Sequence, residues 1–151
     1  MIYYPIFVDL RDRPVLVAGA GPVALRKARG LIEAGAKVTI VAPEALAEIA
    51  ALGAKLILRR YRATDLRGKF LVLAATNDRK VNASIAAQAK KLGILVNVAD
   101  APEECDFLVP ARVRDGSLQI AISTGGENPR VAKAMRKSME SLLGEFREKL
   151  V

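Results

Sequence analysis

Short apolar runs alternate with longer amphipathic stretches over the first two-thirds of the chain. Short apolar runs are typical of buried strands, and apolar residues at helical spacing are typical of amphipathic helices. The pattern predicts five strands, near residues 14–18, 37–42, 55–59, 69–74 and 94–98. It predicts three helices, near residues 21–34, 44–52 and 78–92. Strands and helices that alternate at this spacing predict a parallel sheet with helices on both faces.

The first predicted helix and the third predicted strand show how these elements are arranged. Four apolar residues recur at helical spacing in the helix: Ala24, Ala28, Leu31 and Ile32. We expect them to face the sheet, and Gly35 is well placed to end the helix. The strand Lys55–Arg59 is charged at both ends, which favours a position at the edge of the sheet.

The pattern changes after Asp100. Residues 106–113 and 117–123 resemble two strands joined at Arg114-Asp115-Gly116, which predicts a hairpin. A final helix is expected from about Pro129, where proline fits the first turn. Its apolar stripe comprises Val131, Met135, Met139, Leu142 and Leu143.

The hairpin carries apolar residues on both faces, and a two-stranded hairpin alone cannot bury them. It must pack on the sheet or on a second copy of itself, so we expect a homodimer formed partly by this segment. The chain is therefore expected to comprise a nucleotide-binding domain at residues 1–104 and a dimerisation segment, the hairpin and last helix, at residues 105–151.

A glycine turn follows the first predicted strand. Gly19-Ala20-Gly21-Pro22-Val23-Ala24 matches G-x-G-x-x-A, the small-residue form of the dinucleotide fingerprint. Gly19 permits a sharp turn, Gly21 lets backbone N–H groups approach a pyrophosphate, and Ala24 lets the helix pack closely on the sheet. The alternative is a plain structural turn. Because the motif leaves a strand and opens a helix, it favours a Rossmann-like, doubly wound α/β fold that binds a dinucleotide.

Composition narrows the chemistry. The chain has 151 residues, 52% of them hydrophobic, which is enough for a substantial core. No apolar run approaches the roughly 20 residues that cross a bilayer, and the N-terminus lacks a signal-peptide pattern, so a cytoplasmic protein is expected. The single cysteine, Cys105, excludes an internal disulfide and a cysteine metal cluster. Histidine is absent, so proton chemistry falls to Asp, Glu, Lys, Tyr or water.

The net charge of +8 fits nucleic acid, an anionic small molecule or a generally basic surface. The basic residues are scattered and tryptophan is absent, so a stacking platform for single strands is not expected. A polyanionic substrate together with cofactor phosphates accounts for the charge most economically, and no nucleic-acid partner is expected.

Four segments, in order along the chain, carry a resemblance to a known family: YPIFVDLRDRPVLVAGAGPVALRKARGLIEAGAKVTIVAPE, LAATND, NVADAPEECDFLVPARV and IAISTGGENP. Together they resemble the precorrin-2 dehydrogenase family, which includes the N-terminal part of siroheme synthases. The resemblance implies NAD-dependent oxidation of precorrin-2 to sirohydrochlorin, on the route to siroheme. The implied substrate is a tetrapyrrole with many carboxylates, which fits the basic excess. Some members also insert ferrous iron, a step for which this chain offers no histidine and few ligands.

Asp100 is the candidate catalytic residue. It follows the predicted strand 94–98, and ligands of open α/β sheets bind at the carboxyl ends of strands. It also matches the functionally important aspartate in the family's N-V-x-D segment. A carboxylate near the nicotinamide is a reasonable proton acceptor. Two alternatives stay open: an aspartate that hydrogen-bonds its own turn before Pro102, and one that orients substrate while water takes the proton.

Two neighbours of Asp100 in the sequence invite other interpretations. Asp106 could share a proton or a metal with Asp100, but the spacing is no recognised metal motif. A structural role for Asp106 and a packing role for Cys105 are expected, and no metal site.

The expected cofactor is NAD rather than NADP, because no arginine for a 2′-phosphate lies near the end of the second strand. Glu44 could accept the ribose hydroxyls; equally, it could be a first-turn acid that complements the dipole of the next helix. The resemblance implies that Thr76, in the family's A-A-T-D-D region, contacts the cofactor. The residues expected to bind the cofactor are Gly19, Gly21, Pro22, Val23, Pro43, Glu44 and Thr76.

A second glycine-rich turn precedes the last predicted helix. It comprises Ser123, Thr124, Gly125 and Gly126, and its N–H groups are candidates to hold a substrate carboxylate. The alternative is a hairpin exit and helix cap, in which Ser and Thr hydroxyls satisfy free amides and Asn128 is the N-cap.

Two other functions compete with the enzyme. A non-catalytic dinucleotide-sensing module should show a clear acid at the end of the second strand and no NVxDxP segment. A basic nucleic-acid-binding protein should show salt-dependent DNA binding and no affinity for NAD.

Overall fold

The computed structural model describes residues 3–150, with side chains as far as Glu145. The chain forms two compact units. The first comprises residues 6–107, and the second comprises residues 108–150 together with residues 3–5. The division lies between Phe107 and Leu108, whereas the sequence placed it after residue 104.

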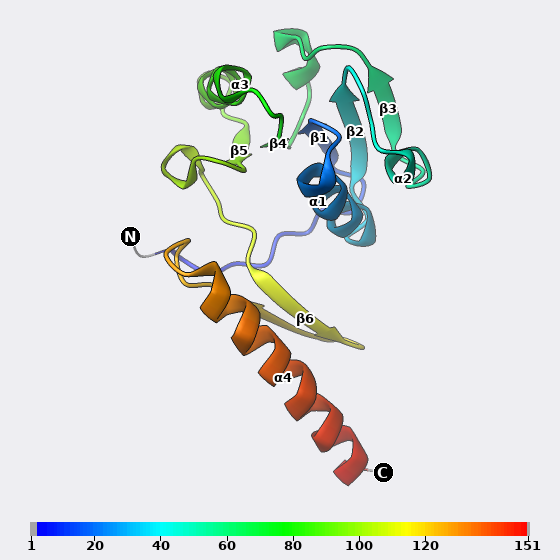
Figure 1. Ribbon diagram of the computed structural model, residues 1–151, viewed down its shortest axis with the longest axis vertical. Helices are drawn as coiled ribbons and strands as arrows, with labels where there is room; N and C mark the ends of the chain where they lie inside the picture. The colour runs from blue at the N-terminus through cyan, green and yellow to red at the C-terminus, as the bar shows by residue number, and fades with distance from the viewer. Residues whose placement is uncertain (1–2, 151) are drawn as a thin grey trace. The chain divides into compact units, whose positions relative to one another are not determined.

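The first unit is built on a five-stranded parallel sheet with strand order β3-β2-β1-β4-β5 (Figure 1). The strands are β1 (Pro14–Ala18), β2 (Lys37–Ala42), β3 (Lys55–Leu58), β4 (Leu71–Ala74) and β5 (Leu95–Val98). The helices are α1 (Pro22–Glu33), α2 (Ala47–Ala50) and α3 (Arg79–Lys91), with short 3₁₀ turns η1 (Ala63–Leu66) and η2 (Pro102–Glu104). This topology confirms the doubly wound class. The strand order reverses between β1 and β4, where such sheets bind their ligands.

Alternate residues of the central strands enter two separate cores. On one face, Val17 packs in a buried cluster with Ala24 and Ala28 of α1. On the other face, Leu16 packs in a second buried cluster with Ile85 of α3. All five side chains are fully buried, which explains why strands covered on both faces read as continuous apolar runs.

Two further expectations are confirmed and one is wrong. Leu31 and Ile32 pack against the same cluster as the rest of the α1 stripe, and β3 is an edge strand. The expected helix at residues 44–52 is only the single turn α2. The chain is still extended at its N-cap, Leu46, whose N–H donates to Ala20 O at 3.2 Å. The residues after β2 therefore form a loop against the glycine turn rather than the start of a helix.

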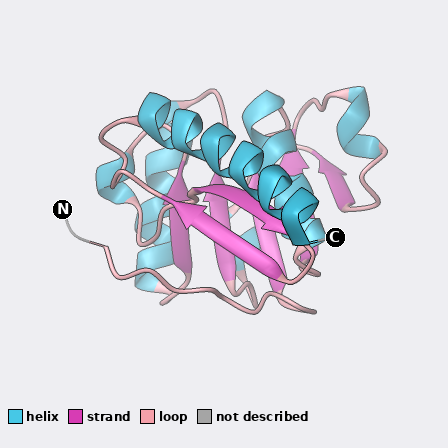
Figure 2. Ribbon diagram, turned by 90° about the horizontal axis from the view of Figure 1, so that it is seen from below, coloured by secondary structure: helices cyan, strands magenta, loops and turns pink. Residues whose placement is uncertain are grey.

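The second unit is an antiparallel hairpin with one long helix packed along it (Figure 2). Its elements are β6 (Ala111–Asp115), β7 (Leu118–Ile122) and α4 (Pro129–Leu150). In the described chain, residues 3–150, no helix has the length and apolar character to cross a bilayer.

The expected bounds of the hairpin are wrong on both sides of its first strand. The strand starts later because Asp106 N–H bonds to Val96 O at 2.8 Å, which ties that segment to β5. It ends later because Asp115 pairs with Leu118, so the turn is Gly116-Ser117. Such tight turns need a positive φ at the first turn residue, and Gly116 supplies it at 58°.

Candidate functional site

Gly19 directly follows β1 at the point where the strand order reverses, and it lies against Ala75 and Thr76, which follow β4. Its φ is 107°, and a Cβ there would lie 2.2 Å from Ala75 O and 3.0 Å from Thr76 N. Its N–H donates to Val41 O at 2.9 Å. Only glycine lets the exit of β1 pass this close to the exit of β4.

The N-terminus of α1 follows the glycine turn and has no side-chain cap within the described part of the chain. Gly21 is its extended N-cap and Pro22 occupies the first turn, where a missing N–H costs nothing. Among the described residues, none caps this helix with a side chain, and its first turn has no acid. A Cβ at Gly21 would meet nothing within 4 Å, and the neighbouring Val23 is 37% exposed. The first-turn amides thus have no side-chain acceptor among these residues, and there is space beside Gly21, as in helices that bind phosphate at their N-terminus.

The loop after β2 borders this turn. Pro43 and Glu44 are both exposed, and the bond from Leu46 N–H to Ala20 O fastens their loop to the glycine turn. Because α2 starts at Ala47 behind its N-cap, Glu44 lies outside the helix, and the acid in the first turn is Glu48. The interpretation of Glu44 as a first-turn acid is therefore wrong.

The exits of β4 and β5 are joined by one buried amide, that of Asn82 on α3. Its Oδ1 accepts from Thr76 N–H at 3.1 Å and from Thr76 Oγ1 at 2.7 Å. Its Nδ2 donates to Thr76 O at 3.1 Å and to Asp100 Oδ1 at 3.0 Å. Asp100 itself is exposed, two residues beyond β5. The structure thus brings Gly19, Thr76 and Asp100 to the same side of the sheet, at the carboxyl ends of β1, β4 and β5.

A cation lies beside this carboxylate. Arg79, the first residue of α3, pairs with Glu104 of η2, and this hydrogen bond raises the pKa of the guanidinium. The charges of Asp100 and Glu103 act in the same direction. The edge therefore carries a mixed charge network rather than an isolated acid.

Comparison with known proteins identifies the family. Residues 6–111 match the family described as putative NAD(P)-binding, and residues 115–142 match the one described as sirohaem biosynthesis protein central. The solved structure of SirC, precorrin-2 dehydrogenase, has a TM-score of 0.76 at 33% identity, covering 92% of this chain and 70% of that one. The chain belongs to the precorrin-2 dehydrogenase family. The resemblance seen in the sequence is thereby confirmed, as is a nicotinamide dinucleotide as the class of cofactor.

Relatives also include siroheme synthases. Those of Methylococcus capsulatus and Ectopseudomonas mendocina are 44% identical over 147 residues and 46% identical over 143 residues. The matches cover 95% and 93% of this chain but 31% of each synthase. The chain thus corresponds to less than a third of the length of these siroheme synthases.

In this member of the precorrin-2 dehydrogenase family, the second glycine-rich turn lies in the hairpin–helix unit. Ser123 Oγ accepts from Gly125 N–H at 3.1 Å, and Thr124 Oγ1 accepts from Asn128 N–H at 3.0 Å. Asn128 Oδ1 accepts from Val131 N–H at 3.2 Å, which confirms it as the N-cap of α4. These contacts are those of a hairpin exit and helix cap.

Cys105 and Asp106 extend the edge of β5. Cys105 Sγ accepts from Val98 N–H at 3.1 Å, and burial raises the pKa of this thiol. Asp106 accepts from Val96 N–H at 3.0 Å, which is the expected structural role. Among the side chains that the structure describes, no cluster of three His, Cys, Asp or Glu residues could hold a metal ion.

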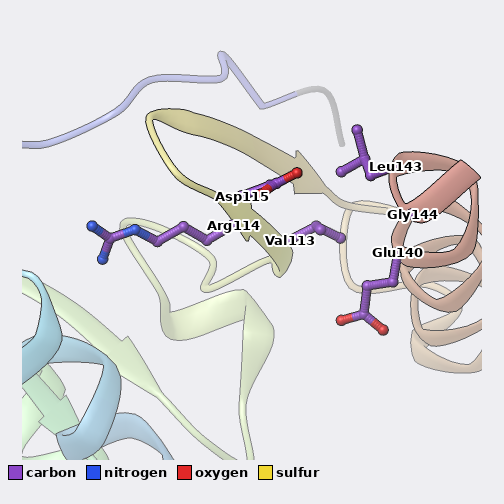
Figure 3. A pocket seen from close by; sticks show the side chains of 6 residues that line it. All are labelled: Val113, Arg114, Asp115, Glu140, Leu143 and Gly144. Carbon is purple, nitrogen blue, oxygen red and sulfur yellow. The ribbon is translucent and has the colours of Figure 1, made fainter. Parts of the chain in front are cut away.

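A shallow pocket lies between β6 and α4 in the hairpin–helix unit, away from these residues in the sequence. Val113, Arg114 and Asp115 line it from β6, and Glu140, Leu143 and Gly144 line it from α4 (Figure 3). Its volume is about 210 Å³, below the roughly 300–1,000 Å³ of small-molecule sites. This pocket is too small for a tetrapyrrole.

Asn82 is not among the site residues predicted from the sequence. The signal was present, because Asn82 shares a helical stripe with Ile85, Ala86 and Ala89, all of which are buried. A polar residue on an otherwise apolar buried stripe must find hydrogen-bond partners, and here the partners are site residues.

Proposed function

We propose that this chain oxidises precorrin-2 to sirohydrochlorin with NAD⁺ in siroheme biosynthesis. The proposal rests on one observation: in a chain of the precorrin-2 dehydrogenase family, the glycine turn and Asp100 lie at the same edge of three neighbouring strands, β1, β4 and β5. Adjacent strands are about 4.8 Å apart, so the exits of β1 and β5 are separated by roughly 10 Å. A nicotinamide ring beside a substrate fits such a span.

The residues present fit a dinucleotide. The uncapped first turn of α1 and the open space at Gly21 would receive the pyrophosphate, flanked by Pro22 and Val23. Pro43 and Glu44 would border the adenosine, with Glu44 accepting the ribose hydroxyls. The loop between β2 and α2 contains no arginine for a 2′-phosphate, which favours NAD over NADP.

The oxidation removes one hydride and one proton from the macrocycle. Bound NAD⁺ would supply the hydride acceptor. Asp100 would take the proton on its exposed carboxylate, because Oδ1 is engaged by Asn82 and Oδ2 is left for the substrate. Thr76, held by the same amide, would border the cofactor.

The charges of the site suit a polycarboxylate. Arg79 stands beside Asp100 with its side chain 45% exposed and could exchange Glu104 for a substrate carboxylate. In the hairpin–helix unit, taken by itself, we assign a substrate carboxylate to the turn Ser123–Gly126, where it would replace the Ser123 hydroxyl on the Gly125 amide. A long-range positive field would raise the local concentration of such a substrate.

The working form proposed is a homodimer in the cytoplasm. Several apolar side chains of the hairpin–helix unit are about half exposed: Leu118, Val131, Met135 and Leu142. A second copy would cover them, as the two-stranded hairpin requires. The chain has one cysteine and so cannot form an internal disulfide. This is compatible with the reducing conditions of the cytoplasm.

The test mixes the protein with precorrin-2 and NAD⁺ and follows the absorbance of the reduced nicotinamide together with the spectrum of sirohydrochlorin. Asp100→Asn should keep NAD⁺ binding, measured by calorimetry, and lose at least about a hundredfold in kcat. Asp12→Asn, which makes the same change at an exposed acid before the start of β1, is the matched control and should keep normal turnover.

Each alternative has its own outcome. NAD⁺ uptake without turnover would indicate a sensing module, and DNA binding without NAD⁺ uptake would indicate a nucleic-acid-binding protein. Stronger binding of NADP⁺ than NAD⁺ would overturn the assignment of Glu44. Full turnover of Asp100→Asn would remove Asp100 from the chemistry while leaving the reaction in place.

A further inference from the structure

We propose that Asn82 is a positioning residue, which holds the Asp100 carboxylate for proton transfer and couples it to the cofactor side of the site. This inference rests on the proposed function of Asp100. It concerns a side chain that is completely buried and bonds to Thr76 and Asp100.

The amide of Asn82 is completely buried, and every hydrogen-bonding position on it is used. Oδ1 accepts two bonds, both from Thr76, while Nδ2 donates one bond to Thr76 O and one to Asp100 Oδ1. An amide offers two donors and two strong acceptor positions, so no capacity remains. Burial at 0% exposure would be costly for this group without such partners.

The partners also fix which way the amide points. Turned over, its NH₂ group would face the Thr76 N–H, and its oxygen would face the Asp100 carboxylate. Both contacts would be repulsive, so the network admits one orientation. The backbone N–H and C=O of Thr76, which follows β4, therefore hold Nδ2 in the orientation that bonds to Asp100.

Asp100 needs such a constraint because it is exposed and lies beyond the end of β5. A side chain there would otherwise sample several rotamers, and catalysis depends on holding the reacting group in one geometry. The bond to Asn82 fixes one oxygen and leaves the other facing outward. A neutral amide does this without placing a second charge on the carboxylate.

The same side chain reaches the cofactor edge through Thr76. The N–H of Thr76 bonds to Asn82 Oδ1, and it lies 3.0 Å from where a Cβ on Gly19 would stand. A shift of Asn82 would therefore move Asp100 and the wall of the glycine turn together. We infer that this shared support sets the distance between proton acceptor and hydride acceptor.

The decisive variant is Asn82→Asp, which keeps the side-chain volume and the acceptor for Thr76 N–H and Oγ1 but replaces the NH₂ donor with an oxygen, which repels Asp100 and the carbonyl oxygen of Thr76. It should lower kcat by about a hundredfold, the typical cost of misplacing a reacting group by roughly 1 Å. The KM for NAD⁺ and the calorimetric Kd should change less than kcat, because the retained acceptor oxygen still holds Thr76 N–H and Oγ1 on the cofactor side. Gln88→Ala is the control on the same helix, α3. It removes the acceptor of the Tyr61 hydroxyl, away from Thr76 and Asp100, and should leave kcat unchanged.

A double-mutant cycle separates positioning from folding. In Asp100→Asn the residue to be positioned is gone, so adding Asn82→Asp should lower kcat no further. An equal fractional loss in both backgrounds, or full turnover of Asn82→Asp, would overturn the proposal. Should Asn82→Asp fail to fold, Asn82→Ser provides the same cycle with a shorter neutral side chain. Full turnover of Asp100→Asn alone would instead refute the proposed role of Asp100.

Discussion

The two units of the chain bury their apolar residues to very different extents. In the first unit, Val15, Leu16, Val17 and Ala18 of β1 are all 0% exposed, between helices on both faces. In the described part of the second unit, the buried apolar side chains are Val113 and Ala132, while Val131 and Met135 are each 46% exposed. The first unit closes its own core, whereas the second leaves apolar surface uncovered by its own hairpin and helix. The proposed chemistry is placed on the self-sufficient unit.

The largest effect should come from opening the closed core. Leu16→Ala removes a fully buried side chain from the centre of the sheet, so the free energy of unfolding should fall by about 3 kcal/mol. Leu142→Ala, at a position 41% exposed, should change it by less than about 0.5 kcal/mol under dilute, monomeric conditions. Urea unfolding of both variants measures the contrast. Equal losses would show that the two units do not differ in this way.

The next effect concerns the uncovered surface. Leu142→Glu places a charge on the exposed face of α4, so it should weaken the proposed dimer by at least about tenfold in dissociation constant. Lys137→Glu, an exposed position on the same helix outside the apolar stripe, is the control for the change in charge. Sedimentation over a range of concentrations gives both constants. A parent protein that stays monomeric at every concentration would contradict the dimer.

The smallest effect is expected beside the edge strand β3, where Arg59 pairs with Asp65. Asp65 in η1 accepts bonds from Arg59 at 2.8 and 2.6 Å and from Arg62 N–H at 2.8 Å, and the Arg59 contact holds the Asp65 pKa below its ordinary value of 3.8. A lowered carboxyl pKa stabilises the fold above the ordinary value, and this contribution is lost as the pH falls through the folded-state pKa. Asp65→Asn should therefore cost about 1 kcal/mol at neutral pH.

The same variant should lose its penalty in acid. Unfolding of the parent and Asp65→Asn is compared at about pH 7 and about pH 3, where the difference should shrink. If the free energies of unfolding of the two proteins differ by the same amount at both pH values, the charge of Asp65 does not contribute to stability.

Much of the fold follows from the sequence alone because its signals are local. The runs that form β1 and β2 have their predicted bounds, 14–18 and 37–42, since continuous apolar residues flanked by turn residues leave little choice. The glycine turn after β1 is equally predictable from the sequence. Gly19 is required by a contact with the next strand exit, but its motif is contiguous in the chain.

The errors arose where partners distant in the sequence decide the structure. The apolar segment after residue 104 resembled a strand, but Asn97 Nδ2 bonds to Phe107 O at 2.9 Å and holds that segment on the first unit. Helical composition after Pro43 was overridden by the bond between Leu46 and Ala20. Asn82 was missed for the same reason, because its importance lies in contacts with Thr76 and Asp100 rather than in any local pattern.

The half-buried thiol of Cys105 offers a chemical measure of motion near the proposed proton acceptor. Cys105 is the single cysteine of the chain, and its sulfur is hydrogen-bonded to Val98 at the end of β5. Its raised pKa keeps the reactive thiolate scarce at neutral pH, so alkylation of the native protein is slow and accelerates when this strand end opens. The labelling rate, followed by mass spectrometry with and without NAD⁺, would report how often the end of β5, which leads into Asp100, separates from its surroundings.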